Sequence, residues 1–312
     1  MDYLQLGKSF FNANQISFAE HYFSKALENE PDNIDTLLHL GQVYLIQNRL
    51  DLAENRLTHV HEIAPDNHEA LILLDFLYRQ LGDNRSIEYF QKTITAGVGE
   101  DEIYLLMGIV CIGKGRLNDA EEFLRQAWES NPQNADVYWW FARLYKVKAR
   151  YDDAEQLILE AIQLNSSQVD YWCEYASICF DKNDITNAIR LYLKCLTLND
   201  KMFDTWNDLG CCYLETGEYD KAKDCWHKAM EIYKYHFGPY YNLACVEARA
   251  NNIDKSLEYL EKAFSFAPEL LCSFVAKDED LSQLWNDTRF TYMYVKYCSD
   301  AKNDEQMNKK YV

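Results

Sequence analysis

The sequence contains few residues that interrupt helices. Five prolines and eleven glycines are spread over 312 residues, and hydrophobic residues make up 48% of the chain. Runs of β-branched residues bounded by turn residues are missing, which argues against strands. Long helices joined by short connections are therefore expected. We predict an all-α fold with enough apolar residues to bury a large core.

Positive charge is also scarce. Lys and Arg number 31 against 50 Asp and Glu, so the formal net charge is -19. Nucleic-acid binding relies on clustered cations that displace counterions, so we expect no nucleic-acid partner. No apolar stretch reaches roughly eighteen residues, and the N-terminus lacks a basic region followed by an apolar run. We predict a cytoplasmic protein without membrane insertion.

Sequence motifs for catalysis or metal binding are missing as well. There is no phosphate-binding Gly loop, no Gly-x-Ser-x-Gly and no Cys-x-x-Cys. His59 and His61 are two residues apart and cannot share a helical face, which argues against a metal site with His68. We predict that the chain is not an enzyme, with no catalytic residues, no metal and no cofactor.

Ten cysteines occur at irregular spacing. Cys111, Cys179 and Cys195 fall on apolar helical faces, where a thiol acts as a small buried hydrophobe. In a long helical chain this distribution fits reduced thiols better than a disulfide framework.

The chain contains an internal repeat of thirty-four residues. The stretch "LGKSFFNANQISFAEHYFSKALENEP" (6–31) aligns with "LGQVYLIQNRLDLAENRLTHVHEIAP" (40–65). A small residue after Leu, an aromatic three residues later, an Ala and a closing Pro coincide in both. Such a period indicates stacked helical hairpins, because one hairpin cannot bury its apolar faces alone.

This pattern resembles the tetratricopeptide repeat family, which implies a right-handed α-α superhelix. Positions 4, 7, 8 and 11 of each repeat share one face of the first helix, A, and positions 20, 24 and 27 share one face of the second, B. Small residues at positions 8 and 20 let the two helices approach closely. Position 8 is filled by Gly7, Gly41, Asp75, Gly108, Ala142, Ala176, Gly210 and Ala244.

The repeat register predicts the domain organisation. Residues 269–298 resemble the segment that closes such arrays, and 299–312 read as a polar tail. No comparable cap precedes the first repeat, whose open end could be covered by a partner, by a second copy through self-association, or by sequence not included here. The eight repeats, residues 1–268 together, are 1–33, 34–67, 68–100, 101–134, 135–168, 169–202, 203–236 and 237–268.

The third repeat is irregular. One residue is missing between its helices, position 8 is Asp75, and it ends in "TAGVGE" where Pro is expected. Two interpretations stay open: a tolerated imperfection, or a local bend or hinge around Gly97 and Gly99.

The resemblance also implies that positions 2, 5, 9 and 12 of helix A face a concave groove. The first four repeats present mainly apolar residues there, and the fifth adds a Trp beside two cations. The groove residues that we select are Leu4, Phe11, Leu38, Leu45, Ile72, Phe76, Leu105, Ile109, Trp139, Arg143, Lys146, Phe180, Asn207 and Tyr241.

An exposed apolar strip in a concave surface usually marks a partner site. We therefore predict a non-catalytic scaffold, adaptor or chaperone that binds another protein through a peptide or amphipathic segment. A tight superhelix in which neighbouring repeats cover part of the strip is the competing interpretation. Two other functions stay open: the recognition part of a larger enzyme such as a protein glycosyltransferase, or a self-associating structural array.

A family subgroup that binds the C-terminal carboxylates of heat-shock chaperones uses Lys at position 5 and Asn at position 9. Neither occurs here, and position 2 is acidic in six repeats. Those carboxylates either stabilise the helix dipole or attract a basic ligand.

The stretch "DVYWWFARLYK" (136–146) places three aromatic residues on different helical faces. We assign Phe141 to the core and Trp140 to a seal against an adjacent repeat. Trp139 shares the groove face with Arg143 and Lys146, which predicts an aromatic anchor beside a carboxylate site, unless Asp136 or Asp170 pairs with the cations.

Overall fold

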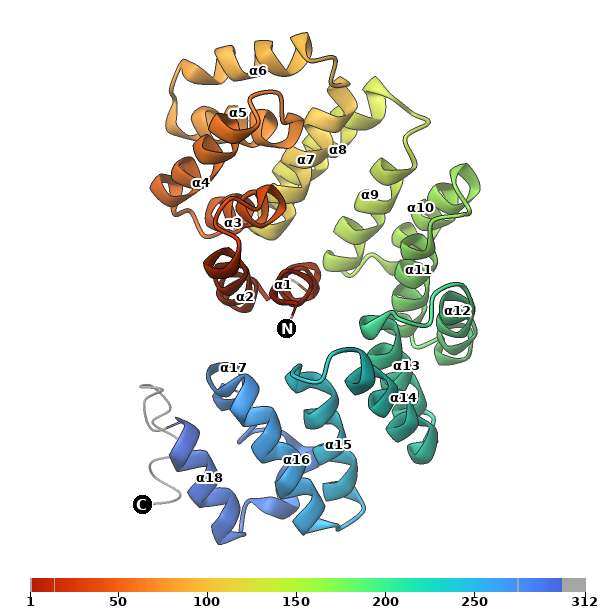
Figure 1. Cartoon of the computed structure of the whole chain (residues 1–312). Helices are drawn as coiled ribbons and strands as arrows, with labels where there is room; N and C mark the ends of the chain where they lie inside the picture. Colours follow the sequence, from red (N-terminus) through yellow and green to blue (C-terminus); the bar gives the residue numbers. More distant parts are fainter. Residues whose placement is uncertain (1, 14, 274, 299–312) are drawn as a thin grey trace. The chain divides into compact units, whose positions relative to one another are not determined.

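The computed structural model describes residues 2–13, 15–273 and 275–298, and these form helices without a strand (Figure 1). Each predicted repeat contains one antiparallel A–B pair, which confirms the predicted all-α solenoid. The pairs are α1 (Tyr3–Asn12) with α2 (Ile16–Asn29), α3 (Ile34–Ile46) with α4 (Leu50–Ile63), α5 (His68–Leu81) with α6 (Arg85–Thr95), α7 (Glu100–Gly113) with α8 (Leu117–Ser130), α9 (Ala135–Val147) with α10 (Tyr151–Leu164), α11 (Val169–Asp181) with α12 (Ile185–Leu198), α13 (Phe203–Glu215) with α14 (Tyr219–Ile232), and α15 (Phe237–Arg249) with α16 (Ile253–Phe266).

The chain divides into two compact units, Met1–Ile178 and Cys179–Val312. The boundary falls inside α11, in the sixth repeat. The sequence predicts one uninterrupted array over residues 1–268, and the division is not visible in the repeat pattern. The repeat pattern describes the packing of the two helices within a pair, whereas the division between units depends on the packing between successive pairs.

Small residues allow the two helices of a pair to touch. A Cβ atom on Gly41 would lie 2.5 Å from the Cδ2 atom of Leu57, and one on Gly210 would lie 2.4 Å from the Nε1 atom of Trp226. Leu57 and Trp226 are themselves fully buried. Position 8 therefore has to be small wherever a bulky position 24 packs against it, as the sequence predicts.

The turn from helix A to helix B repeats along the chain. One residue of the turn, one or two positions after the end of helix A, adopts the left-handed conformation, where Gly and Asn are favoured. The residue that follows donates its N–H to a carbonyl five residues back, as Arg150 does to Tyr145 at 2.8 Å. Six of these left-handed residues are Asn48, Gly82, Gly115, Asn183, Gly217 and Asn251. The fifth repeat has Ala149 there, at φ 55°.

The third repeat differs in its second helix. α6 has 11 residues, whereas the other B helices have 14. The missing residue is absorbed where α6 begins, because the Ser86 N–H bonds the carbonyl of Asp83, three residues back, at 3.1 Å. The equivalent N–H in the second repeat, that of Ala53, reaches Arg49, four residues back.

Asp75 is fully buried in this repeat, where the other repeats have Gly or Ala. Its Oδ1 atom accepts a hydrogen bond from Nε of Arg79 at 2.8 Å. Its Oδ2 atom has no hydrogen-bond partner among the described residues. Burial raises the pKa of Asp75, and Arg79 offsets this only in part.

Three short helices follow the last repeat: α17 (Pro268–Cys272), η1 (Glu279–Leu284) and α18 (Thr288–Cys298). They pack against α15 and α16, and Leu281 and Leu284 are fully buried. The side chains of Asp278 and Asp287 accept the N–H groups of Asp280 and Arg289, as expected of residues that begin helices. The tail, 299–312, lies outside the described residues.

One pair of cysteines contradicts the expectation of reduced thiols. Cys272 and Cys298 form a disulfide between α17 and α18. The other eight cysteines form no disulfide, and Cys111, Cys179 and Cys195 are buried as predicted. The pairing could not be read from the sequence, because the two cysteines are 26 residues apart and approach only when α18 folds back.

Candidate peptide-binding groove

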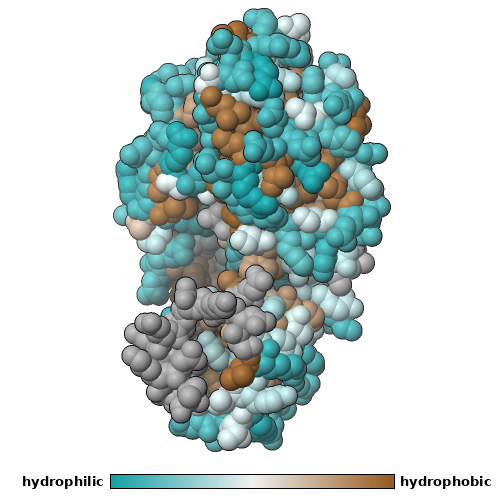
Figure 2. Space-filling view, turned by 90° about the vertical axis from the view of Figure 1, so that its left-hand side faces the viewer, coloured by the Kyte–Doolittle hydropathy of each residue, from teal (hydrophilic) through white to brown (hydrophobic). Residues whose placement is uncertain are grey.

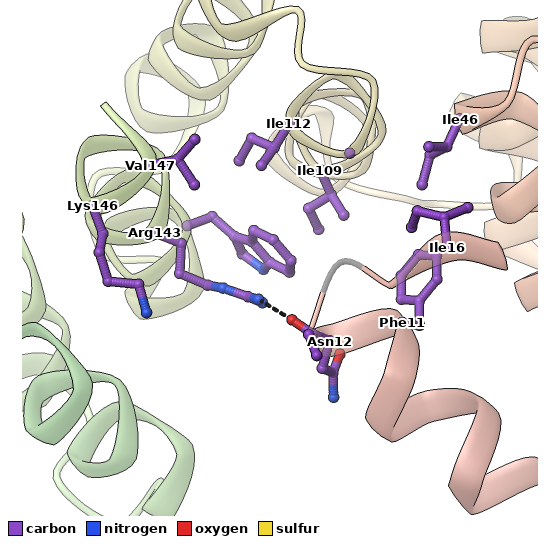
Figure 3. A pocket seen from close by; sticks show the side chains of 12 residues that line it. Phe11, Asn12, Ile16, Ile46, Ile109, Ile112, Arg143, Lys146 and Val147 are labelled. Carbon is purple, nitrogen blue, oxygen red and sulfur yellow. Dashed lines mark hydrogen bonds between the residues drawn. The ribbon is translucent and has the colours of Figure 1, made fainter. Parts of the chain in front are cut away.

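A pocket of about 310 Å³ opens among the helices of the first unit (Figure 3). The C-terminal end of α1 and the start of α2 form one wall, α3 and α7 form the floor, and α9 forms the other wall. The lining is mainly apolar: Phe11, Ala13, Ile16, Ile46, Ile109, Ile112, Gly113, Trp140 and Val147, with Asn12, Arg143 and Lys146 as the polar members.

Close packing of α7 on α3 sets the floor of the pocket. A Cβ atom on Gly113 would lie 2.6 Å from Cδ1 of Ile46, so the two helices meet only because Gly113 has no side chain. Ile109 and Ile112 project from the same helix as Gly113 and are half-buried. Val147 stands at the rim, with 57% of its surface exposed.

Arg143 joins the first repeat to the fifth. Its guanidinium lies 4.4 Å from the centroid of the Trp140 ring, and its Nη2 atom donates to the carbonyl oxygen of Asn12 at 3.1 Å (Figure 3). Asn12 is the last residue of α1, where carbonyls lack a partner within the helix and carry partial negative charge. A cation at this point therefore stabilises the contact between α1 and α9.

The two cations are paired inside the protein. Nζ of Lys146 lies 2.6 Å from Oε1 of Glu174 and 3.0 Å from Oγ of Ser177. Nε of Arg143 lies 3.6 Å from Oε2 of the same glutamate, whose side chain is only 11% exposed. Their partner is thus Glu174, rather than the Asp136 or Asp170 considered from the sequence. A ligand carboxylate would therefore have to compete with Glu174, which offsets one of the two positive charges.

The two tryptophans exchange the roles that the sequence predicts. Trp139 packs into the core formed by α9, α10 and α11, with its ring 5.6 Å from that of Tyr171. Its Nε1 atom is buried and has no partner among the described residues. Trp140, predicted to seal an adjacent repeat, lines the pocket instead.

Five predicted groove residues are covered by intramolecular packing. Ile72 and Phe76 are each only 4% exposed, and Leu45 is not exposed at all. Helix A of one repeat packs directly on helix A of another, as α3 does on α5 and α7, so part of the strip is core. This agrees with the competing interpretation of a tight stack. The full set is Leu38, Leu45, Ile72, Phe76 and Tyr241.

The other predicted residues are accessible to different degrees. Phe11, Ile109, Arg143 and Lys146 line the pocket. Leu4 and Leu105 are half-buried outside it, and Phe180 and Asn207 are half-buried in the second unit.

Eight of the twelve pocket residues were not selected from the sequence, among them the large side chains of Ile46, Trp140 and Val147. These three occupy positions 13, 6 and 13 of their repeats, next to the positions chosen. A signal was present, because Trp140, Arg143 and Val147 follow the i, i+3, i+7 spacing of one helical face. The open face of α9 is therefore turned by about one residue from the face that the family pattern implies.

The acidic residues at position 2 make contacts between repeats. Nζ of Lys8 lies 2.5 Å from Asp35 in the next repeat, and Nε2 of Gln42 donates to Glu69 at 2.5 Å. The hydroxyl of Tyr171 donates to Asp136. These carboxylates thus stabilise the stack, in addition to any favourable interaction with the helix dipole.

The equivalent face of the second unit is occupied by internal polar contacts. Tyr241 donates its hydroxyl to Asp278, and Nδ2 of Asn242 donates to Oδ1 of Asn207 at 3.2 Å. The Cys245 sulfur and one carboxylate oxygen each of Asp278 and Asp280, atoms that could bind a metal ion, lie within 4.8 Å of one another. Asp280 is paired with Arg249 at 2.7 Å, and burial raises the pKa of the Cys245 thiol, so this cluster is better explained as packing of η1 on α15.

Comparison with known families identifies the class of protein. Family models of the tetratricopeptide repeat match residues 12–75 and 111–172, residues 169–202 and residues 201–269. The chain belongs to the tetratricopeptide repeat family, and its fold is that of a protein-interaction scaffold. The matches leave out residues 76–110, which contain α6. None of the curated protein sequences matches significantly.

Solved structures with similar folds include several repeat proteins. Cut9–Hcn1 of the APC/C is 17% identical, with a TM-score of 0.54 over 84% of this chain and 52% of that chain. YrrB, a repeat protein with an unusual peptide-binding site, is 22% identical, with a TM-score of 0.44 over 56% and 90%. PilF of Pseudomonas aeruginosa is 16% identical, with a TM-score of 0.46 over 80% and 96%. At these identities the similarity concerns the fold alone.

No helix in the described part of the chain is long and apolar enough to cross a membrane. Viewed from one side, the protein has several apolar surface patches separated by polar side chains (Figure 2).

Proposed function

We propose that the first unit binds an apolar segment of another protein, with one or two large side chains inserted into the pocket between α1 and α9. The observation that carries this proposal is the pocket itself. Its walls are apolar in a chain of net charge -19, and Val147 is exposed at its rim. A volume of about 310 Å³ is at the lower end of the range of roughly 300–1,000 Å³ found for ligand sites.

The internal contacts of the pocket narrow the class of ligand. Arg143 and Lys146 both interact with Glu174, so an acidic ligand would have to compete with this internal carboxylate for them. An acidic ligand therefore has little to gain there, whereas burial of apolar surface yields about 25 cal/mol per Å². An extended segment with bulky aliphatic or aromatic side chains fits best, and the protein acts as a scaffold without a reaction of its own.

A selection from a random peptide library tests the proposal. Peptides are displayed on phage and selected for binding to the wild-type protein. Binding of the selected peptides is then measured for Val147→Asp, a variant that places a charge at the pocket rim. Because Val147 is exposed, the variant should fold normally, and circular dichroism verifies this. Selected peptides should share large apolar residues and bind Val147→Asp at least about tenfold more weakly, a loss of about 1.4 kcal/mol.

Leu159→Asp is the matched control, since it places the same charge at an exposed apolar position of α10. Binding to this control should equal binding to the wild type. If no peptides are enriched, or if the enriched peptides bind both variants equally, the pocket is not the site.

A further inference from the structure

A stripe of apolar side chains runs along the outer face of α6. Ile87 is 69% exposed and Ile94 is 37% exposed, and Phe90 between them is half-buried. Their i, i+3, i+7 spacing places the three side chains on one face of the helix. Tyr89 and Thr93 are buried instead and hold α6 against α5 (Figure 1). We call Ile87, Phe90 and Ile94 the α6 stripe.

α6 differs from the other B helices at one of these positions, position 24. Phe90 stands at position 24, whose other occupants are nearly or fully buried: Phe23, Leu57, Leu124, Ile158, Tyr192, Trp226 and Leu260. α6 also differs from the other B helices in its length, 11 residues against 14, and in the missing residue at its start.

The link from α6 to the next repeat is also missing. In the second and fourth repeats, the position of Ile87 holds a glutamate that accepts a hydrogen bond from a tyrosine of the following helix A. Glu54 accepts from Tyr78 at 2.8 Å, and Glu121 accepts from Tyr145 at 2.9 Å. The residue of α7 equivalent to these tyrosines is Cys111, which offers no such hydroxyl. α7 packs on α5 and α3, so the α6 stripe lacks the cover that the following helix A gives elsewhere.

The charges near the stripe distinguish between occupants. Arg85 is paired with Glu54 and Asp83, and Lys92 with Glu88. Glu100 and Glu102, which begin α7 a few residues after α6, are exposed, and no ion pair involves them within the described residues. Arg79 of α5 also lies over the Phe90 ring, 5.3 Å from its centroid, and is paired with Asp75. Among the described charges that are close to the α6 stripe in the sequence, those without an ion pair are therefore acidic residues, among them Glu100 and Glu102.

We propose that the α6 stripe binds an amphipathic helix of another protein, with the apolar face of that helix on Ile87, Phe90 and Ile94 and a flank of Lys or Arg near Glu100 and Glu102. A helix is the occupant that this face lacks, because the following helix A packs on α2, α4, α8, α12 and α14, whereas α7 packs on α5 and α3. A second copy of this chain fits less well, since two chains of charge -19 repel each other. An 11-residue helix also spans only about 16 Å, too little for a standard dimer interface.

The test uses a fluorescein-labelled, capped peptide of Leu and Lys with Leu at helical i, i+3, i+4, i+7 spacing, and a twin with Glu in place of Lys. Fluorescence anisotropy measures binding to the wild type, to Ile87→Asp with Ile94→Asp, and to Leu159→Asp with Leu164→Asp. The last pair is the matched control, because both leucines are exposed on α10 of the same unit. Glu100→Gln with Glu102→Gln tests the charge contribution.

We expect the Lys peptide to bind the wild type with a dissociation constant below about 100 μM, and Ile87→Asp with Ile94→Asp to weaken binding at least tenfold. The control pair should change affinity less than about twofold, and Glu100→Gln with Glu102→Gln should weaken binding several-fold and reduce its salt dependence. Ile87→Ser with Ile94→Ser replaces the Asp pair if circular dichroism shows unfolding.

Three results would overturn the proposal: no binding by the wild type, equal loss in the Ile and Leu variant pairs, or equal affinity for the Glu twin. Light scattering that shows a wild-type dimer, abolished by the Ile87 and Ile94 substitutions, would assign the α6 stripe to a second copy instead. Val147→Asp should bind the Lys peptide as the wild type does, so failure of the pocket proposal and failure of this one are distinguishable.

Discussion

Replacing Arg143 by Met tests how the first repeat is held against the fifth. Met keeps an unbranched apolar stem that can still cover Trp140, but it removes the guanidinium. The hydrogen bond to the Asn12 carbonyl is lost, together with the cation–π contact at 4.4 Å. Glu174 is not left unpaired, because Lys146 remains 2.6 Å away. The effect should therefore be confined to the contact between α1 and α9.

The magnitude follows from these two interactions. A hydrogen bond to a charged group contributes about 1.5–3 kcal/mol, and a partly exposed cation–π contact about 0.5–1 kcal/mol. The Arg143 side chain is 20% exposed, so solvent screens it only partly. We expect the α1–α2 pair to lose about 2 kcal/mol of local stability. This loss corresponds to roughly thirtyfold faster amide hydrogen exchange in α1 if exchange occurs by local opening.

Hydrogen exchange followed by mass spectrometry measures this directly, with Lys146→Met as the control that keeps the bridge. Peptides from α1 should exchange faster in Arg143→Met, whereas peptides from α15 and α16 should not change. Unchanged exchange in α1, or an equal increase in both variants, would refute the argument that Arg143 holds the first repeat in place.

Three further changes address stability. Asp75→Ala should raise the free energy of unfolding by about 1–2 kcal/mol at pH 7 in urea titrations, because an unpartnered buried carboxylate oxygen is removed and the half-exposed Arg79 can be hydrated. Burial raises the folded-state pKa of Asp75, so the wild type gains stability as the pH falls through that pKa. The difference in unfolding free energy between Asp75→Ala and the wild type should therefore shrink in acid. A difference that does not depend on pH would contradict this cause. Ala149→Gly should raise the melting temperature by relieving a left-handed Ala, with about 0.5–1 kcal/mol remaining after the entropy cost of Gly; a destabilised variant would show that the turn is not strained. Cys272→Ser should destabilise the cap by about 3 kcal/mol on the chain-entropy estimate for a 26-residue separation from Cys298, and dithiothreitol should lower wild-type but not variant stability.

The sequence predicts the fold well because the fold depends on interactions within each repeat. Gly41 faces Leu57 and Gly210 faces Trp226 at separations that the thirty-four-residue period fixes. The turn residues at Asn48 and its equivalents are likewise local. Such interactions recur in every hairpin, so an error at one repeat does not change the prediction for the next.

The site was predicted less well because it depends on how far the helices turn and stack beyond one repeat. Val147 and Arg143 face Phe11 across a pocket whose two walls are more than one hundred residues apart in the sequence. No local rule states whether position 5 or position 6, Trp139 or Trp140, lines that space. The pairing of Arg143 and Lys146 with Glu174 is likewise a contact between repeats, so the sequence indicated two cations but not their partner.

The third repeat departs from the pattern of the other repeats in a way that packing within the repeat does not explain. A structural imperfection should be reduced by restoring the residue that most other repeats use. Ile87 stands where four of the seven other repeats have Glu20, Glu54, Glu121 and Glu155, and the last three have Ile189, Lys223 and Leu257. Because Ile87 is exposed and the hydroxyl partner is absent from α7, a Glu at this position would remove apolar surface from water without a loss of packing. The fold therefore gains little from Ile87 at this exposed position. Since local rules are broken most often where a protein has a function to serve, this face is where a partner is expected.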